Sequence, residues 1–164
     1  MRDLSRIDPE EDCDIHRFML IALEEATEAA LEGEVPVGAV IVQDREVLAR
    51  DHNRREQLQD PTAHAEMLVM RAAAETLCSW RLDNCELYVT LEPCPMCAGA
   101  MVQGRLGRLV FGARDPKAGA VVSLYNILDD QRLNHRVPWV EGVMAKECAA
   151  ALRDFFSRLR NQEG

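Results

Sequence analysis

The sequence predicts an α/β protein: a three-layer α/β/α sandwich in which helices cover both faces of a central five-stranded mixed sheet. Predicted strands alternate with predicted helices along the chain, which is typical of a sheet packed between helices. Apolar residues make up 48% and charged residues 29% of the 164 residues, as in ordinary globular proteins. This length matches one domain of about 100–200 residues. We expect a single domain over residues 14–164, preceded by a loose acidic arm over residues 1–13.

The first half of the predicted domain contains one long helix and a strand pair. Asp14 is a candidate cap for a helix that ends near Leu31, where a glycine follows. The apolar run 35–42 predicts a buried strand, and a short polar turn leads into a second strand over 46–49. Two strands joined by so short a turn are expected to run antiparallel.

The second half alternates more regularly between helices and strands. A polar loop over 50–60 is followed by Thr62, a candidate cap for a helix over 63–77. Because helices join the later strands, we expect those strands to run parallel. The remaining predicted elements are strand 86–90, helix 96–103, strand 109–112, helix 123–128, strand 137–140 and helix 145–159.

Charge is distributed unevenly along the chain. The net charge is −9, and residues 1–34 alone, with 11 acidic and three basic side chains, carry −8 of it. The segment 104–117 is instead net positive, which fits contact with phosphate groups, although arginines on a solvated face would give the same pattern. Its charged residues are Arg105, Arg108, Arg114, Asp115 and Lys117.

Membrane and secretory classes are excluded by what the chain lacks. No apolar run approaches the roughly 18 residues that a spanning helix needs. The start of the chain has neither the apolar stretch nor the cleavage site of a secretory signal. We therefore expect a cytoplasmic protein whose six cysteines are reduced rather than paired in a disulfide framework.

Two cysteines and a histidine have the spacing of a metal site. Cys94 and Cys97 form a C-x-x-C pair flanked by prolines, and taken alone such a pair is a redox pair, half of a structural zinc site or a chance match. No second C-x-x-C pair exists, so a zinc ribbon is excluded and histidine is the favoured type for the remaining ligand. His64 lies in the sequence His-Ala-Glu at the start of a predicted helix. Three ligands with an open fourth position is the arrangement of catalytic zinc.

Glu66 completes the motif. It follows His64 by two residues, and 26 residues separate it from the Pro-Cys-x-x-Cys element. Each residue has an ordinary structural explanation when taken alone, since a helix start favours acidic side chains. Together they match the known signature of zinc-dependent nucleobase and nucleoside deaminases. In that chemistry zinc makes hydroxide available near pH 7 and the glutamate moves protons to the base and the leaving ammonia.

Beyond this signature, the sequence resembles the bacterial tRNA-specific adenosine deaminases of the cytidine/deoxycytidylate deaminase superfamily. The similarity covers nearly all of residues 14–160. The Phe-Gly-Ala-Arg-Asp and Asn-His-Arg stretches indicate the tRNA branch within the superfamily. The matching stretches are 34–40, 52–54, 60–66, 90–94, 96–101, 111–115, 134–136 and 147–150.

The resemblance implies a cytidine deaminase-like fold and a reaction, the hydrolysis of adenosine to inosine at the wobble position of tRNA. It implies one Zn²⁺ per chain, a tRNA anticodon stem-loop as partner, and a homodimer. It also assigns roles to residues of this chain. Zinc would be bound by His64, Cys94 and Cys97; Glu66 would move the proton; the substrate would contact Asn53, Val35, Ala113, Arg114, Asp115 and Phe156.

Several alternatives remain open from the residues alone. Val35 and Phe156 have the character of core residues, and Asn53 that of a turn residue. A small-molecule nucleobase deaminase, such as a guanine deaminase, shares the Pro-Cys-Pro-Met-Cys start, although Arg114 and Asp115 favour the tRNA branch. A non-catalytic RNA-binding subunit is the other alternative, and it would be expected to lack Glu66.

Overall fold

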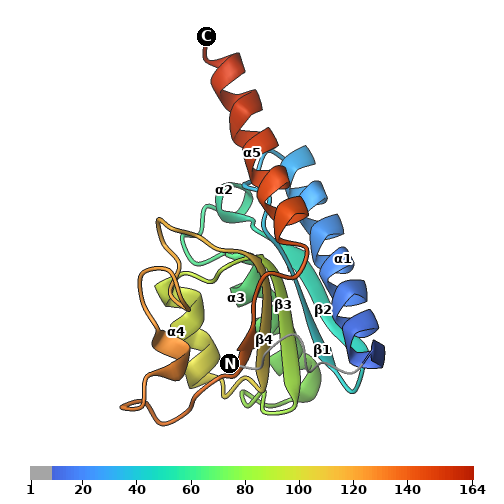
Figure 1. Ribbon diagram of the computed structural model, residues 1–164, viewed down its shortest axis with the longest axis vertical. Coiled ribbons are helices and arrows are strands. Elements are labelled where there is room, and N and C mark those ends of the chain that lie inside the picture. The colour runs from blue at the N-terminus through green and yellow to red at the C-terminus, as the bar shows by residue number, and fades with distance from the viewer. Residues whose placement is uncertain (1–8) are drawn as a thin grey trace.

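The computed structural model describes residues 9–164 and confirms the predicted mixed five-stranded sheet (Figure 1). The strand order is β2-β1-β3-β4-β5. β1 pairs antiparallel with β2 and β3, whereas β3 with β4 and β4 with β5 pair parallel. β1 therefore runs against its four companions. The strands are β1 (Gly38–Gln43), β2 (Glu46–His52), β3 (Cys85–Leu91), β4 (Arg108–Ala113) and β5 (Trp139–Val140).

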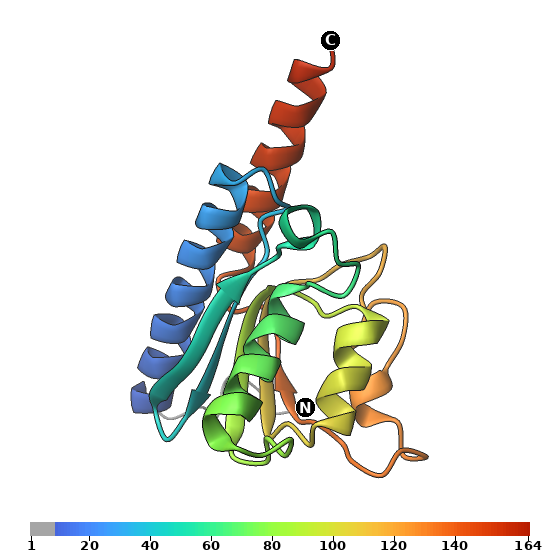
Figure 2. The same ribbon diagram turned by 180° about the vertical axis from the view of Figure 1, so that it is seen from behind.

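Helices cover both faces of this sheet, as predicted. α1 and α5 lie on one face, and α3 and α4 lie on the other (Figures 1 and 2). The last turns of α5 extend beyond the rest of the molecule. Within residues 9–164, no helix combines the length and apolarity that a membrane crossing requires. The helices are α1 (Pro9–Leu31), α2 (Arg55–Leu58), α3 (Ala65–Leu77), α4 (Pro95–Gln103), the short 3₁₀ helix η2 (Ile127–Asp129) and α5 (Ala145–Gln162).

Alternate residues of each central strand enter two separate hydrophobic cores. On β3, Leu87 and Val89 pack with α3 and α4, whereas Tyr88 packs with α1. On β1, Ile41 and Val40 divide in the same way. Successive side chains of a strand point to opposite faces, so a strand covered on both faces has apolar residues at every position. This is why the first predicted strand is a continuous apolar run.

Two predicted boundaries at the N-terminal side are wrong. α1 begins at Pro9 instead of Asp14, so residues 9–13 of the expected arm are helical, and residues 1–8 lie outside the described part of the chain. Asp14 lies inside the helix and does not cap it; its carboxylate forms an ion pair with Arg45 (2.6 Å), which lies in the turn between β1 and β2. The first strand begins at Gly38, because the Val37 N–H donates to the Val35 carbonyl in a tight turn around a proline.

Two predictions further along are also corrected. The expected loop over 50–60 contains the end of β2 and the helix α2. The expected helix over 123–128 reduces to η2. The backbone N–H groups of residues 121–123 donate to the side chain of Glu92, and that of Ile127 donates to the Ala120 carbonyl. These bonds hold the segment in turns, so a longer helix does not form.

Candidate active site

A pocket lies at the edge of the sheet where β2, β3 and β4 end and β1 begins. Because β1 runs against its neighbours, the residues that precede it meet the residues that follow the other three strands. Ligands of open α/β sheets bind at this carboxyl edge. The cavity has a volume of about 210 Å³. It is lined by Val35, Val37, Asn53, Arg55, His64, Ala65, Glu66, Leu91, Glu92, Cys94, Asp115 and Ala118.

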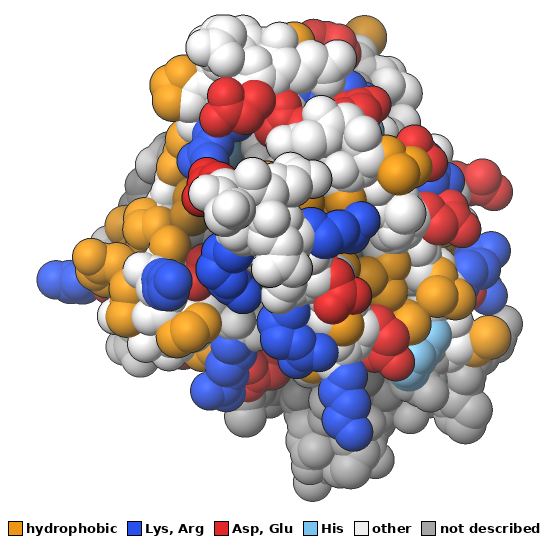
Figure 3. Space-filling model, turned by 90° about the horizontal axis from the view of Figure 1, so that it is seen from above, with side chains coloured by type: hydrophobic (Ala, Val, Ile, Leu, Met, Phe, Trp, Pro, Cys, Tyr) orange, Lys and Arg blue, Asp and Glu red, His pale blue; other side chains and the backbone are white. Residues whose placement is uncertain are grey.

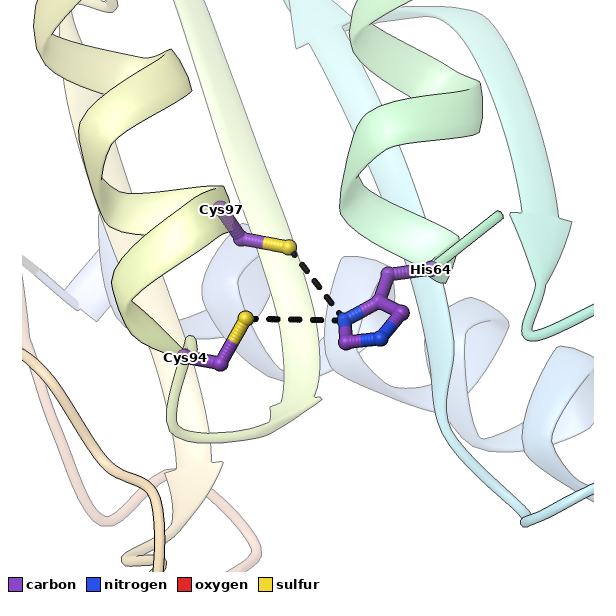
Figure 4. A group of neighbouring side chains, drawn as sticks. All are labelled: His64, Cys94 and Cys97. Atoms are coloured by element: carbon purple, nitrogen blue, oxygen red, sulfur yellow. Dashed lines mark hydrogen bonds between the residues drawn. The ribbon is translucent and has the colours of Figure 1, made fainter. Parts of the chain in front are cut away.

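His64 and Cys94 of the pocket wall converge with Cys97, with both thiols pointing toward the imidazole (Figure 4). The His64 Nδ1 atom lies 3.6 Å from Cys94 Sγ and 3.5 Å from Cys97 Sγ. The three potential ligand atoms lie within 4.8 Å of one another. One imidazole nitrogen and two thiolates form a donor set that suits zinc. The predicted cluster could therefore hold a metal ion.

Two helix starts place these three side chains. His64 is the N-cap residue of α3 and Cys94 is that of α4, with Pro95 opening the latter helix. The predicted cap Thr62 instead donates its backbone N–H and hydroxyl to the Asp60 carboxylate. The positive end of a helix dipole favours anions, so both helix starts favour thiolate character at the cluster.

The two thiols of the cluster differ in the direction of their pKa shifts. The hydrogen bond with Cys97 lowers the pKa of Cys94, burial opposes it, and the hydrogen bond with His64 lowers it further, to about 4. The hydrogen bond with Cys94, together with burial, raises the pKa of Cys97. The hydrogen bond with Cys94 also raises the pKa of His64 against the effect of burial. The hydrogen bonds within the cluster thus favour a thiolate, the form that binds a metal ion.

Glu66 lies in the first turn of α3, on the pocket wall beside the cluster. Its side chain is buried, with the residue only 4% exposed. Burial raises the pKa of Glu66 to about 7, because the charged carboxylate is poorly solvated there. A carboxyl group with this pKa can both accept and donate a proton near neutral pH.

Three of the residues expected at the substrate also line the pocket: Val35, Asn53 and Asp115. Asn53 is buried, its backbone N–H donates to the Val37 carbonyl (3.0 Å), and its Oδ1 accepts the Arg55 N–H (3.3 Å). Asp115 accepts the N–H groups of the next turn of its loop through Oδ1. The pocket is therefore lined by one amide residue, three acidic residues and aliphatic side chains.

The structure does not bring the other expected substrate residues to the pocket wall. Ala113 is buried at the end of β4 in the core beneath α1 and α5. The Arg114 guanidinium forms two hydrogen bonds with Glu141 (2.7 and 2.8 Å). Phe156 is 42% exposed on α5 and packs edge-on against Phe155, with ring centroids 5.4 Å apart.

The basic residues of the net-positive segment 104–117 do not form one surface beside the pocket. Arg108 opens β4 and Arg105 precedes it, so both lie at the edge of the sheet opposite the pocket. Arg108 pairs with Glu86, and Arg105 donates to the Asn134 carbonyl. Seen from above, the surface carries basic side chains interspersed with acidic and apolar ones (Figure 3).

The sequence did not predict six of the pocket residues: Val37, Arg55, Ala65, Leu91, Glu92 and Ala118. Val37, Leu91 and Glu92 lie at or next to the end of an observed strand, and that position was the available signal. α2, which carries Arg55, was missed because a buried carboxylate holds it. Glu34 is 2% exposed and accepts the N–H groups of Glu56 and Gln57 at the start of α2.

An ion-pair network around the buried His52 joins β2 to α1, next to Asn53 in the chain. His52 is 3% exposed, and its ring nitrogens lie 2.7 Å from Glu25 and 2.8 Å from Glu32. Two carboxylate acceptors require both nitrogens to donate, so the ring is an imidazolium. Burial alone would lower the pKa of His52, but the hydrogen bonds to Glu25 and Glu32 outweigh it and raise the pKa. Asp51, Arg50 and Arg54 complete the network.

We expect this network to make stability fall as the pH rises. A raised pKa means that the folded protein binds the proton more tightly, so the stabilisation is full below the ordinary value of 6.5 and is lost as the pH rises through the folded-state pKa. The free energy of unfolding should therefore drop more for the wild type than for His52→Gln between about pH 6 and about pH 8.5. Urea denaturation at several pH values measures this difference, and parallel curves for the two proteins would contradict it.

Comparison with known proteins places this chain and its fold among deaminases. The family model of MafB19-like deaminases matches residues 13–160. A tRNA-specific adenosine deaminase of Bacillus subtilis (strain 168) is 50% identical over 146 residues, covering 89% of this chain and 91% of that protein.

Two solved structures share the fold. One, from a study of A-to-I editing by tRNA:A34 deaminases at the wobble position of transfer RNA, has a TM-score of 0.81 and 46% identity over 83% of this chain and 99% of that chain. A guanine deaminase from Nitrosomonas europaea has a TM-score of 0.76 but 22% identity, over 87% of this chain and 84% of that chain, which shows the fold alone. The chain therefore belongs to the MafB19-like deaminase family and, within it, to the tRNA-specific adenosine deaminases.

Proposed function

We propose that this chain catalyses the hydrolytic deamination of adenosine to inosine at the wobble position of tRNA. The observation that carries the proposal is the pairing of a His-Cys-Cys cluster with a buried glutamate in one pocket. The relative at 50% identity and the tRNA:A34 deaminase structure support adenosine in tRNA as the substrate. The cavity of about 210 Å³ is of a size for one base, which fits a nucleotide flipped out of a loop.

One Zn²⁺ per chain is proposed at His64, Cys94 and Cys97. The cluster fits the ion, because it offers one nitrogen and two sulfur atoms and Cys94 ionises readily. Three protein ligands leave room for a water molecule. When bound, zinc lowers the pKa of water from about 16 to about 7 and so supplies a hydroxide nucleophile at neutral pH.

Glu66 is proposed to hold and move the proton. Its carboxylate takes a proton from the attacking water, donates it to the ring nitrogen of the base, and assists the departure of ammonia. Its pKa of about 7 suits both directions of transfer. Asn53 would hydrogen-bond the base or its ribose, and Val35 would pack against the base.

The remaining roles concern contacts with the rest of the RNA. The loop of Ala113, Arg114 and Asp115 is proposed to meet the anticodon backbone, with Arg114 exchanging Glu141 for a phosphate. Phe156 would contact a neighbouring nucleotide from α5. We also propose that residues 14–164 form the deaminase domain, that the protein acts as a homodimer, and that it works in the cytoplasm, where its tRNA substrate is.

The substrate assignment is tested by offering RNA and free bases to the same preparation. We expect inosine from an anticodon stem-loop with adenosine at the wobble position, and none from a matched loop whose only adenosines lie elsewhere. Free guanine, cytosine and adenine should stay unchanged. Mass spectrometry of the nucleosides and an ammonia assay measure both outcomes. Release of ammonia from guanine with an unchanged stem-loop would replace the proposal by a small-molecule deaminase, and RNA binding without turnover would indicate a non-catalytic subunit.

A further inference from the structure

Glu92 is a buried acid that the proposed chemistry does not use. It is 2% exposed and follows the last residue of β3, two positions before the cluster residue Cys94. Its backbone N–H donates to the carbonyl of Ala113 (2.8 Å), which continues the pairing of β3 with β4 beyond the strand ends. The side chain therefore starts from a rigid point of the sheet, next to the candidate metal centre.

The carboxylate of Glu92 accepts hydrogen bonds from both ends of the loop that follows β4. Oε1 accepts the backbone N–H groups of Val121 (3.2 Å), Val122 (2.8 Å) and Ser123 (2.8 Å). Oε2 accepts the backbone N–H of Asp115 (2.9 Å) and the hydroxyl of Ser123. A buried carboxylate is costly unless it is hydrogen-bonded, and five donors satisfy this one.

The loop packs directly onto this carboxylate. A Cβ atom added at Gly119 would lie 2.3 Å from Cδ and 2.3 Å from Oε2 of Glu92, so only glycine fits there. The Ala120 N–H donates to the Pro93 carbonyl (2.8 Å), which ties the middle of the loop to the residue before Cys94. The loop is thus attached to the end of β3 by its first, middle and last residues.

This attachment determines one wall of the pocket, because Asp115 and Ala118 of the same loop line the cavity. We propose that Glu92 is a positioning residue, which holds the loop 115–123 against the end of β3 so that Asp115 and Ala118 meet the substrate at a fixed distance from the His-Cys-Cys cluster. Glu92 acts through the loop and is not itself a proton carrier. Of this inference, only the expected change in KM and kcat rests on the proposed function.

Glu92→Gln is the informative variant. An amide keeps one oxygen for the three N–H groups of residues 121–123 but turns an NH₂ group toward the Asp115 N–H, so that end of the loop loses its anchor. We expect amide hydrogen exchange in residues 115–120 to accelerate at least about tenfold. This factor corresponds to the loss of about one hydrogen bond to a charged group. Melting temperature and metal content should stay close to wild type.

The kinetic signature separates positioning from catalysis. The KM for the anticodon stem-loop should rise about tenfold or more in Glu92→Gln, while kcat falls less, because the pocket wall is displaced and Glu66 is intact. Glu86→Gln is the matched control: Glu86 lies on the same strand, pairs with Arg108 at the opposite edge of the sheet, and should leave exchange in residues 115–120 and KM unchanged.

A double-mutant cycle tests whether the loop and the carboxylate act as one unit. Ser123→Ala removes only the hydroxyl donor to Glu92 Oε2, so it should accelerate loop exchange modestly in the wild type and have little further effect in Glu92→Gln. Unchanged exchange in Glu92→Gln would overturn the inference, and so would a loss confined to kcat. Absence of inosine with the wild type would overturn the proposed function, while the exchange data would still decide the role of Glu92.

Discussion

Replacement of Glu66 by alanine is expected to abolish turnover while the protein keeps its fold and its metal. The Glu66 carboxyl is buried and lines the pocket beside the His-Cys-Cys cluster, and its pKa of about 7 suits repeated proton transfer. General acid–base catalysis contributes about 10²–10⁴-fold to a rate, so single-turnover conversion of the stem-loop should fall by at least about 10³-fold. Circular dichroism and metal analysis on the same sample check fold and metal content.

Two further variants make the Glu66 result specific. Glu66→Gln keeps the shape and polarity of the side chain but cannot carry the proton, so it should be as inactive as the alanine variant. Glu75→Ala removes an exposed acid from the other end of α3 and should leave turnover unchanged. Retained turnover in both Glu66 variants would refute the role of this carboxyl and leave the proton to another group.

Replacement of Cys94 by serine is expected to remove both metal and activity. Cys94 is the N-cap of α4, its thiol has a pKa of about 4, and it points at the His64 imidazole. A serine hydroxyl is a poor zinc ligand because it does not ionise near neutral pH. Bound zinc should fall from about one per chain to a small fraction, and turnover should fall at least as steeply.

The control for Cys94→Ser is another cysteine of the same chain. Cys13 is exposed on α1, on the opposite face of the sheet from α4. Cys13→Ser should keep the wild-type metal content and rate, measured after dialysis against a dilute chelator. Full metal content in Cys94→Ser, or loss of metal in Cys13→Ser, would show that the ligand set is wrong.

Local sequence patterns predict most of the helices and strands, and they predict the cluster. Hydrophobic periodicity predicts the strands and helices because one face of each element must be buried. Buried residues therefore recur along the chain with the period of that element, about two in a strand and 3.6 in a helix. The motif of His64, Glu66, Cys94 and Cys97 is equally local. Its first two residues lie at the start of one helix, and its two cysteines lie at the start of another. The structure brings these two helix starts together, as the motif predicts.

The sequence-based predictions are wrong where a side chain from a distant segment accepts the hydrogen bonds that hold an element in place. Glu34 holds the start of α2, and Glu92 holds residues 121–123 in turns. Neither bond is visible in the periodicity of the segment that it organises. Arg105 and Arg108 stand close to the motif along the chain, yet they lie across the sheet from the pocket, because β4 separates them from its carboxyl edge.

The chemistry of this protein can thus be read from its residues, whereas the shape of its pocket cannot. Donor atoms and a proton carrier are chemical types at short spacings, and local helix geometry is enough to orient each pair. The pocket wall depends on strand order and direction. β1 runs against its neighbours, so residues before β1 meet residues after β2, β3 and β4. Contacts between segments this far apart in the chain follow from packing of the whole sheet, and only the folded molecule specifies them.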